Sequence, residues 1–341
     1  MTTSGNISPC DRTPGAKRRG LLIVITGPTA SGKTSLAIEV ARRYGTEIIS
    51  ADSRQMFREI PIGTAAPTAE ELAAVPHHFI GNLHLTDYYS AAIYEKEAMA
   101  AIHDVMDRCS GMTIMCGGSM MYIDAVCHGI DEMPDVSDDI RAFATGIWEK
   151  EGLHGLICRL QQTDPEYLAN APDLHNHKRL IDALEVSLEA GVPYSSLLGK
   201  EKKPRPFDIL KFTVDYPREQ LYDRINRRVE IMIEDGLVEE ARSVYHLRHL
   251  NSLNTVGYKE LFTLFDNVAS GLSAHIAPNL RSGAILDLPS AISRIQKNTR
   301  VYARKQLFWL ARDPSVIHLN PQLPLLAQIE QAVDARSQQP V

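Results

Sequence analysis

The strongest chemical signal in the sequence is a loop suited to binding phosphate groups. Residues 27–34 read Gly-Pro-Thr-Ala-Ser-Gly-Lys-Thr and match the pattern G-x-x-x-x-G-K-[ST], which is typical of ATP-binding proteins. Glycines let backbone N–H groups converge on an anion, Lys33 adds a positive charge, and the Thr34 hydroxyl is a suitable Mg²⁺ ligand. We expect a di- or triphosphate to be bound by Gly27, Pro28, Thr29, Ala30, Ser31, Gly32, Lys33 and Thr34.

This loop alone does not identify the phosphate compound. A typical NTPase has a second apolar strand that ends in an Asp supporting the metal, whereas the apolar segment 113–116 runs into Gly-Gly-Ser. Asp215, after the apolar segment 209–214, is a weaker candidate for such an acid. A kinase, a hydrolase and a transferase with a diphosphate leaving group therefore all stay open.

Asp52 is the candidate for acid–base chemistry. It directly follows the short apolar segment 47–50. The carboxyl ends of parallel strands face one crevice, so this carboxylate could act there as a general base. It could equally cap the segment that begins at 53–55, and its position does not decide between the two roles.

The elements that must position these residues alternate between strand and helix. Strands are predicted at 21–25, 47–50 and 113–116. Helices are predicted after the Gly-rich turn, where apolar residues recur from Leu36 to Tyr44 and Gly45 is the stop, and at 91–108. This order is typical of a parallel sheet wrapped by helices. We therefore predict an α/β fold of the P-loop NTPase-like type, with the first part of its core at 21–128.

The middle of the chain has a different character. Residues 129–206 show helical periodicity at 140–150, 153–160 and 179–189, which predicts a helical insertion domain. The second part of the core, 207–320, is predicted to contain a strand at 209–214 and helices at 218–235, 238–247, 257–266 and 290–311. Residues 1–20 are expected to form a disordered tail and residues 321–341 a second tail.

The formal net charge of −6 argues against a general nucleic-acid binder, but the average conceals a basic stripe. The stretch 291–312 has no acidic residue and contains Arg294, Lys297, Arg300, Arg304, Lys305 and Arg312. Their spacing puts most of them on one helix face, which suits a phosphate backbone. The alternatives are a solvent-exposed face without a partner and packing of this face against the acidic segment 51–200.

Cysteines and hydropathy limit the remaining possibilities. The five cysteines form no CxxC pair, so neither a disulfide framework nor a zinc module is indicated. No apolar run reaches the roughly 18 residues that a membrane helix needs. We expect a cytoplasmic protein without a membrane segment, and a monomer.

Several segments together resemble the tRNA dimethylallyltransferase (tRNA isopentenyltransferase) family, in the family's order. They are 27–34, 48–55, 62–64, 117–122, 178–186, 221–229, 254–259 and 299–306. The resemblance implies transfer of a dimethylallyl group from dimethylallyl diphosphate to N6 of adenosine 37, just 3′ of the anticodon, in tRNAs that read U-initial codons. Pyrophosphate would leave with the help of Mg²⁺, and the anticodon stem-loop would be the partner.

The resemblance also implies roles for individual residues. Asp52 matches the family's base, Ser119 the hydroxyl that contacts the leaving diphosphate, and Arg224 the arginine that stabilises the developing charge. The residues implied in tRNA binding are Asp52, Ser53, Arg54, Gln55, Ser119, Arg141, Lys178, Arg179, Leu180, Ile181, Asp182, Asn254, Thr255, Val256, Gly257, Tyr258 and Lys259. The basic stripe adds Arg300 and Arg304.

Two positions depart from the family pattern. Ser119 keeps the hydroxyl of the family's Thr but lacks its methyl group, and Asp182 stands where many relatives have Arg. Two other functions stay in competition with prenyl transfer. A small-metabolite kinase would use Asp52 to deprotonate a hydroxyl, and a non-catalytic tRNA-binding module would not need Asp52 at all.

Overall fold

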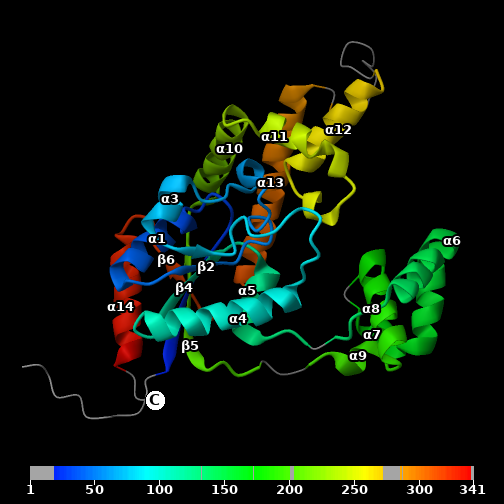
Figure 1. Ribbon diagram of the computed structural model, residues 1–341, viewed down its shortest axis with the longest axis horizontal. Coiled ribbons are helices and arrows are strands. Elements are labelled where there is room, and N and C mark those ends of the chain that lie inside the picture. Colours follow the sequence, from blue (N-terminus) through cyan, green and yellow to red (C-terminus); the bar gives the residue numbers. More distant parts are fainter. Residues whose placement is uncertain are drawn as a thin grey trace, which may run out of the picture. The chain divides into compact units, whose positions relative to one another are not determined.

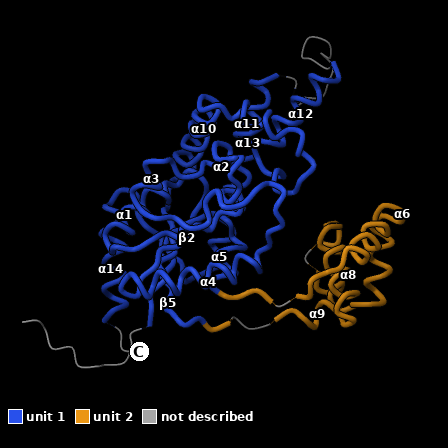
Figure 2. The backbone as a smooth tube through the Cα atoms, in the orientation of Figure 1, with its two compact units in different colours: residues 1–127, 205–341 blue, residues 128–204 orange. Residues whose placement is uncertain are grey.

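The computed structural model describes residues 19–131, 133–171, 173–199, 203–271, 285 and 287–338. The chain divides into two compact units, 1–127 with 205–341 (unit 1) and 128–204 (unit 2), which Figure 2 colours separately. Most of the expected N-terminal tail, residues 1–18, lies outside the described residues. Within the described ranges, no helix combines the length and apolar character that crossing a bilayer requires.

Figure 1 labels most of the secondary-structure elements along the chain. The strands are β1 (Gly20–Thr26), β2 (Ile48–Ser50), β3 (His77–His78), β4 (Met112–Gly117), β5 (Phe207–Val214) and β6 (Val316–Leu319). The helices of unit 1 are α1 (Lys33–Tyr44), α2 (Pro61–Thr64), α3 (Ala69–Ala74), α4 (Ala91–Arg108), α5 (Met120–His128), α10 (Arg218–Glu234), α11 (Leu237–Ser243), α12 (Tyr258–Ala269), α13 (Leu288–Leu310) and α14 (Leu325–Ser337). The helices of unit 2 are α6 (Asp138–Thr163), α7 (Pro165–Asn170), α8 (His177–Ala190) and α9 (Tyr194–Leu197).

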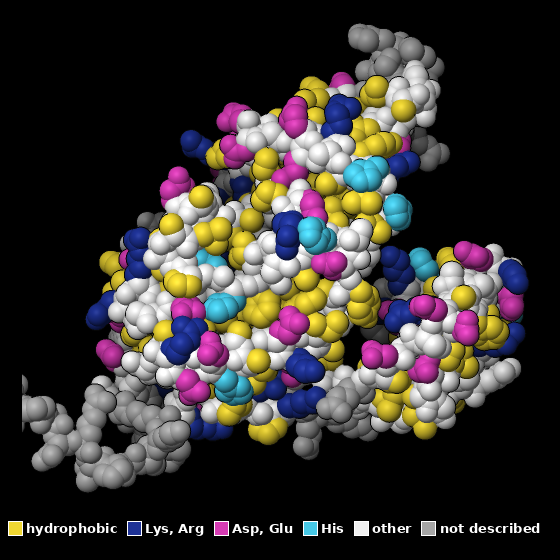
Figure 3. Space-filling view, in the orientation of Figure 1, with side chains coloured by type: hydrophobic (Ala, Val, Ile, Leu, Met, Phe, Trp, Pro, Cys, Tyr) yellow, Lys and Arg dark blue, Asp and Glu magenta, His cyan; other side chains and the backbone are white. Residues whose placement is uncertain are grey.

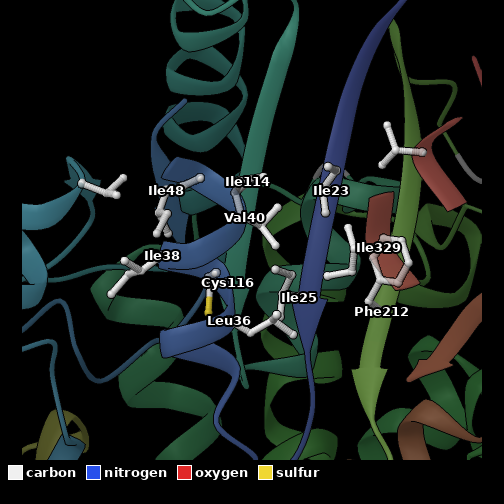
Figure 4. Packing of buried hydrophobic residues seen from close by; sticks show 14 of the residues in the cluster. Ile23, Ile25, Leu36, Ile38, Val40, Ile48, Ile114, Cys116, Phe212 and Ile329 are labelled. Carbon is white, nitrogen blue, oxygen red and sulfur yellow. The ribbon is translucent and has the colours of Figure 1, made fainter. Parts of the chain in front are cut away.

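A six-stranded parallel sheet forms the centre of unit 1, with strand order β3-β2-β4-β1-β5-β6. Alternate residues of β1 enter two separate hydrophobic clusters. Ile23 and Ile25 pack with α1 and α14, and Leu22 and Val24 pack with α4 and α5 (Figure 4 shows the first cluster). Because both faces are covered by helices, the central strand β1 is buried and apolar on both of its sides. The predicted α/β fold with a helix-wrapped parallel sheet is confirmed.

Four strands and six helices of unit 1 were predicted, namely α1, α4, α10, α11, α12 and α13. The helices α2, α3 and α5 were not predicted, and neither were three further elements. Strands β3 and β6 at the two edges of the sheet are short, and each contains histidine. The third is α14, within the segment 321–341 that was expected to be a tail. Ile329 and Val333 of α14 are buried against α1, and this packing makes the segment part of the core.

The described residues of unit 2 form helices and the connections between them, and no strand. Its hydrophobic core is built from α6 and α8 and includes Ile147, Leu156, Leu160 and Leu184. Gly152 adopts a positive φ of 63° and divides α6 at the place where the periodicity indicated a break. Helical structure was therefore predicted correctly for this stretch.

A group of helices beyond the carboxyl ends of the strands completes unit 1. Residues of α10, α11, α12 and α13 share one hydrophobic cluster around the buried Tyr258, and Figure 1 shows these helices gathered beside the sheet. The same helices form much of the wall of the cavity described below. They therefore form one side of this cavity, and the loops that follow the strands form the other.

Candidate active site

The phosphate-binding loop lies between β1 and α1, as predicted. Three of its residues have a positive φ: Gly27 (146°), Ala30 (64°) and Gly32 (80°). A Cβ atom on Gly27 would lie only 3.0 Å from Thr213 Oγ1 and 3.1 Å from Ser31 Oγ. Gly32 precedes α1 without a side-chain cap, so the first N–H groups of this helix are available to an anion.

Three cations, Lys33 of the loop together with Arg54 and Arg228, lie near Asp52. Lys33, Arg54 and Arg228 are half-buried, and burial lowers the pKa of each of them. The charge of nearby Arg228 lowers the pKa of Lys33 further, while Asp52 opposes the shift in all three. Within the described part of the chain, none of the three belongs to an ion pair. Three cations that share one nearby carboxylate carry an excess of positive charge, which favours binding of a polyanion.

These residues line a cavity of about 960 Å³ in unit 1. Its wall includes residues of α1, the turn after β2, α2, α10, α12 and α13. The predicted site residues that line it are Thr29, Gly32, Lys33, Thr34, Asp52, Ser53, Arg54, Gln55, Ser119, Asn254, Thr255, Val256, Gly257 and Lys259. One cavity thus brings together the phosphate loop, the candidate base and two of the segments expected to bind tRNA.

Asp52 stands in the turn that follows β2. Its Oδ1 accepts a hydrogen bond of 3.0 Å from the backbone N–H of Arg54, which fixes the orientation of the carboxylate. Among the described residues, no hydrogen-bond partner meets Oδ2. The carboxylate therefore stabilises its turn through one oxygen and leaves the other available to accept a proton.

Ser119 holds this turn from the neighbouring strand. Its Oγ accepts a hydrogen bond of 2.8 Å from the N–H of Ser53 and donates one of 3.1 Å to Ser53 Oγ. The backbone N–H of Ser119 donates to Ala51 O at 3.1 Å. In the structure the Ser119 hydroxyl is directed at the Asp52 turn, and its expected contact with a leaving diphosphate stays a prediction.

Two arginines one turn apart on α10 differ in their surroundings. Arg224 donates from Nε to Ala30 O at 2.7 Å and lies 4.7 Å from the centroid of the Tyr216 ring. It contacts the phosphate loop in this way but does not line the cavity, whereas Arg228 does. Arg228 was not identified as a site residue from the sequence. The spacing of four residues from Arg224 was the available signal.

The segment 254–259 contributes both exposed and structural residues. Asn254 and Lys259 are exposed, but Tyr258 is fully buried and donates its hydroxyl to Glu240. The side chain of Tyr258 therefore cannot contact tRNA, contrary to expectation, and instead holds its exposed neighbours in place. Gln55 is also structural, because its Nε2 donates to Ala65 O at 2.9 Å and to Thr64 O.

The tRNA-binding residues expected in unit 2 lie on α6 and α8. Burial raises the pKa of Asp182, while the positive charges of Arg141, Lys178 and Arg179 oppose this shift. Asp182 thus lies among three cations that were expected to meet phosphates. Leu180 is fully buried in the core of unit 2, so its side chain cannot contact RNA as expected. Ile181 is half-buried against the same core.

The basic stripe on α13 has two kinds of residue. Arg300 donates from Nη1 to Asn226 Oδ1 and lies beside the Tyr222 ring, so it packs partly against α10. Arg304 is exposed. On the face shown in Figure 3, basic and acidic side chains are interspersed.

Thr34 is the metal ligand that the sequence predicts. Thr34 is half-buried, lines the cavity and lies beside Lys33 and Cys116. The described residues contain no group of three or more His, Cys, Asp or Glu side chains that could hold a metal alone. Asp215, which the sequence offered as a weaker candidate for the metal-supporting acid, contacts His318 at 2.9 Å. His78 contacts Glu47 at 2.7 Å.

Comparison with known proteins identifies the family. The sequence pattern of the IPP transferase family matches residues 55–313. The tRNA dimethylallyltransferase 1 of Phocaeicola vulgatus is 47% identical over 300 residues, which cover 88% of this chain and 94% of the relative. A tRNA dimethylallyltransferase of Porphyromonas gingivalis is 48% identical over 301 residues, which cover the same fractions of the two chains.

Solved structures agree with this assignment. The tRNA isopentenylpyrophosphate transferase of Bacillus halodurans is 30% identical, with a TM-score of 0.65 over 93% of this chain and 96% of that chain. A eukaryotic dimethylallyltransferase acting on tRNA shares the fold, with a TM-score of 0.76 at 23% identity over 94% of this chain and 81% of that one. The resemblance noted from the sequence is confirmed, and the chain belongs to the IPP transferase family, together with the tRNA dimethylallyltransferases.

Proposed function

We propose that this enzyme transfers a dimethylallyl group from dimethylallyl diphosphate to N6 of adenosine 37 in tRNAs that read U-initial codons, and releases pyrophosphate. The observation that carries the proposal is one cavity that joins cations without an ion-pair partner to the Asp52 carboxylate, whose Oδ2 has no hydrogen-bond partner in the described part of the chain. Relatives named tRNA dimethylallyltransferases, 47% and 48% identical over 88% of the chain, support the choice of substrates.

The donor diphosphate fits the cationic end of the cavity. Lys33 and Arg228 stand close enough for the charge of one to lower the pKa of the other, and a bound diphosphate would relieve that repulsion. The N-terminus of α1 adds partial positive charge. As the bond from carbon to the diphosphate oxygen breaks, the electron pair leaves with pyrophosphate, and fixed cations stabilise the added charge. Arg224 supports this arrangement through its bond to Ala30 O.

The acceptor needs a base because the lone pair of the adenine amine is delocalised into its ring. Asp52 Oδ2 would take one N6 proton as the bond between N6 and the allylic carbon forms. The bond from the Arg54 N–H to Oδ1 keeps the carboxylate oriented for this step. We infer that Ser119 contributes by fixing the same turn.

The residues present fit a role for Mg²⁺. This ion is usually held by one or two protein oxygens together with substrate phosphates, and the Thr34 hydroxyl at the cavity wall suits such a site. When bound, the ion would neutralise part of the charge on the diphosphate. Thr34 would hold it, and Lys33 would remain free to contact the phosphates.

The second substrate would be the anticodon stem-loop of tRNA. Its single-stranded loop lowers the cost of turning adenosine 37 out of the base stack. The exposed side chains of Arg304, Asn254 and Lys259 in unit 1 would contact it, and Arg141 and Lys178 in unit 2 would contact its phosphates. We propose a monomer that acts in the cytoplasm, where tRNA is modified.

The test follows incorporation of label from radioactive dimethylallyl diphosphate into unmodified tRNA in the presence of Mg²⁺. We expect Asp52→Ala to lower kcat by ~10²–10⁴, with tRNA affinity retained. Asp235→Asn is the matched control, since Asp235 is another carboxylate at the wall of the cavity. Normal turnover by the Asp52 variant would exclude Asp52 as the base. Phosphate transfer from ATP, without labelled tRNA, would favour the kinase instead.

A further inference from the structure

Gln306 of α13 makes two hydrogen bonds that join separate loops of the site. Its Oε1 accepts from the backbone N–H of Thr29 at 3.0 Å, and its Nε2 donates to Gly118 O at 2.9 Å. The side chain is only 3% exposed. Thr29 belongs to the phosphate loop, and Gly118 precedes the Ser119 that holds the Asp52 turn.

The two loops follow strands that are neighbours in the sheet. Strands β1 and β4 pair in parallel, and their last paired residues are Thr26 and Gly117. Beyond these residues the strand pairing ends, because the segment after β1 leads into α1 and the segment after β4 leads into α5. The Gln306 side-chain amide accepts one hydrogen bond and donates another, and so connects the two loops where no backbone hydrogen bonds join them.

The surroundings of Gln306 are shaped to receive its amide. A Cβ atom on Gly118 would lie 2.6 Å from Gln306 Nε2, so a side chain at this position would displace the amide. The same Cβ would be 3.7 Å from Lys33 Cε, which places the amide beside the phosphate-binding lysine. In α13, Ala303 and Leu310 are buried on the same side as Gln306, while Arg304 and Lys305 are exposed.

We propose that Gln306 is a positioning residue for prenyl transfer, which holds the diphosphate-binding loop in register with the Gly118–Ser119 turn. This inference rests on the proposed function. The path runs from Thr29 through the amide to Gly118, and from Ser119 through Ser53 to the base Asp52. Donor and base are thereby kept at a fixed separation by a residue that touches neither reacting atom.

The first test replaces the amide by a side chain of similar length without hydrogen bonds. Gln306→Met leaves the Thr29 N–H and the Gly118 carbonyl without this partner, so the two loops can move apart. We expect kcat for labelled prenyl transfer to fall by ~10- to 100-fold, because small displacements of reacting groups are costly. The Kd for tRNA, measured without donor, should not change.

A matched control comes from the same helix. Gln296 is a second glutamine of α13, half-buried rather than buried, and its amide donates to Asn226 O and to Glu230 of α10 instead of to either loop. Gln296→Met should keep wild-type kcat. Equal turnover of the two methionine variants would overturn the inference. Should Gln306→Met fail to fold, Gln306→Asn, which keeps a buried amide but shortens its reach, is measured in the same way.

A double-mutant cycle separates positioning from a general packing effect. If Gln306 acts through the Ser119 turn, the loss in kcat of Gln306→Met combined with Ser119→Ala should be smaller than the product of the single losses. Fully multiplicative losses would refute this route. A wild-type protein that labels no tRNA would contradict the proposed function instead, so the two failures are distinguishable.

Discussion

The hydroxyl oxygen of Ser119 accepts a 2.8 Å hydrogen bond from the backbone N–H of Ser53, the residue directly after Asp52. Ser119 follows β4 and Ser53 follows β2, and these strands are paired neighbours in the sheet. Gly117 makes the close approach possible, since a Cβ atom there would lie 2.2 Å from Ala51 O. The orientation of the candidate base therefore depends on a side chain from the next strand.

Removal of this hydroxyl should slow the reaction without preventing substrate binding. In Ser119→Ala the Ser53 N–H loses its acceptor and the Asp52 turn is less constrained, so we expect kcat to fall by about tenfold or more. Ser119→Thr keeps the hydroxyl and adds a methyl group that restricts its rotamer, so it should retain wild-type kcat. Single-turnover prenylation of tRNA measures both variants. An alanine variant with unchanged kcat would show that this bond does not orient Asp52.

Glu240 of α11 organises a second part of the cavity wall. Its carboxylate accepts hydrogen bonds of 2.8 Å from the N–H groups of Ile62 and Gly63 and a third from the Tyr258 hydroxyl. We expect Glu240→Ala to lower the free energy of unfolding by on the order of 3 kcal/mol, because three donors lose one shared acceptor.

The matched variant for this prediction is Tyr258→Phe. It removes one hydroxyl and keeps the buried ring, so the expected loss is about 1 kcal/mol. Urea unfolding measures both stabilities, and the KM for tRNA should rise more in Glu240→Ala, because residues 254–259 lose their support. Equal stability of the two variants would mean that the backbone N–H bonds contribute nothing.

The sheet could be predicted from sequence where packing and local pattern agree. The apolar run in β1 and the stop at Gly45, which has a φ of 61°, are local signals. Helix α14 could not be recognised in this way. It is stabilised by the burial of Ile329 and Val333 against α1, a contact between segments nearly 300 residues apart in the chain.

In the site, too, residues marked by local signals could be predicted and residues defined by distant contacts could not. The phosphate loop and Asp52 were predicted because each follows a strand that the sequence reveals. Gln306 was missed because its partners, Thr29 and Gly118, lie 277 and 188 residues away. Nothing in the residues around Gln306 distinguishes a positioning amide from a core residue of a basic helix, so only the folded arrangement could identify it.

A buried ion pair makes stability depend on acidity. Lys211 of β5 is 3% exposed and donates to Asp313 at 2.7 Å. Burial raises the pKa of Asp313, but the hydrogen bonds from Lys211 and Ser315 outweigh it, and the pKa falls well below the ordinary value. The pair should therefore stabilise the fold fully above the carboxyl pKa of the unfolded chain and progressively less as the pH falls below it.

Asp313→Asn tests this dependence. Near pH 7 it should cost on the order of 3 kcal/mol, since it leaves the charge of a buried lysine without its carboxylate. The gap between wild type and variant should narrow as the pH is lowered toward 2. Asp208→Asn, which breaks an ion pair with the more exposed Arg336, should cost less than about 1 kcal/mol. A gap that stays constant with pH would refute the assigned pKa shift.

The thiol of Cys116 lies in the cavity next to Lys33, where a reactive thiolate would complicate any assay. Burial raises its pKa to about 12, although the positive charge of Lys33 opposes the shift. Because the thiolate is the nucleophile, Cys116 should stay unmodified by iodoacetamide at pH 8, while the exposed Cys158 of unit 2 reacts first. Peptide mass spectrometry after short exposure distinguishes the two sites, and unfolding in urea should make both reactive. Modification of Cys116 as fast as that of Cys158 in the folded protein would mean that the thiol is neither buried nor protonated.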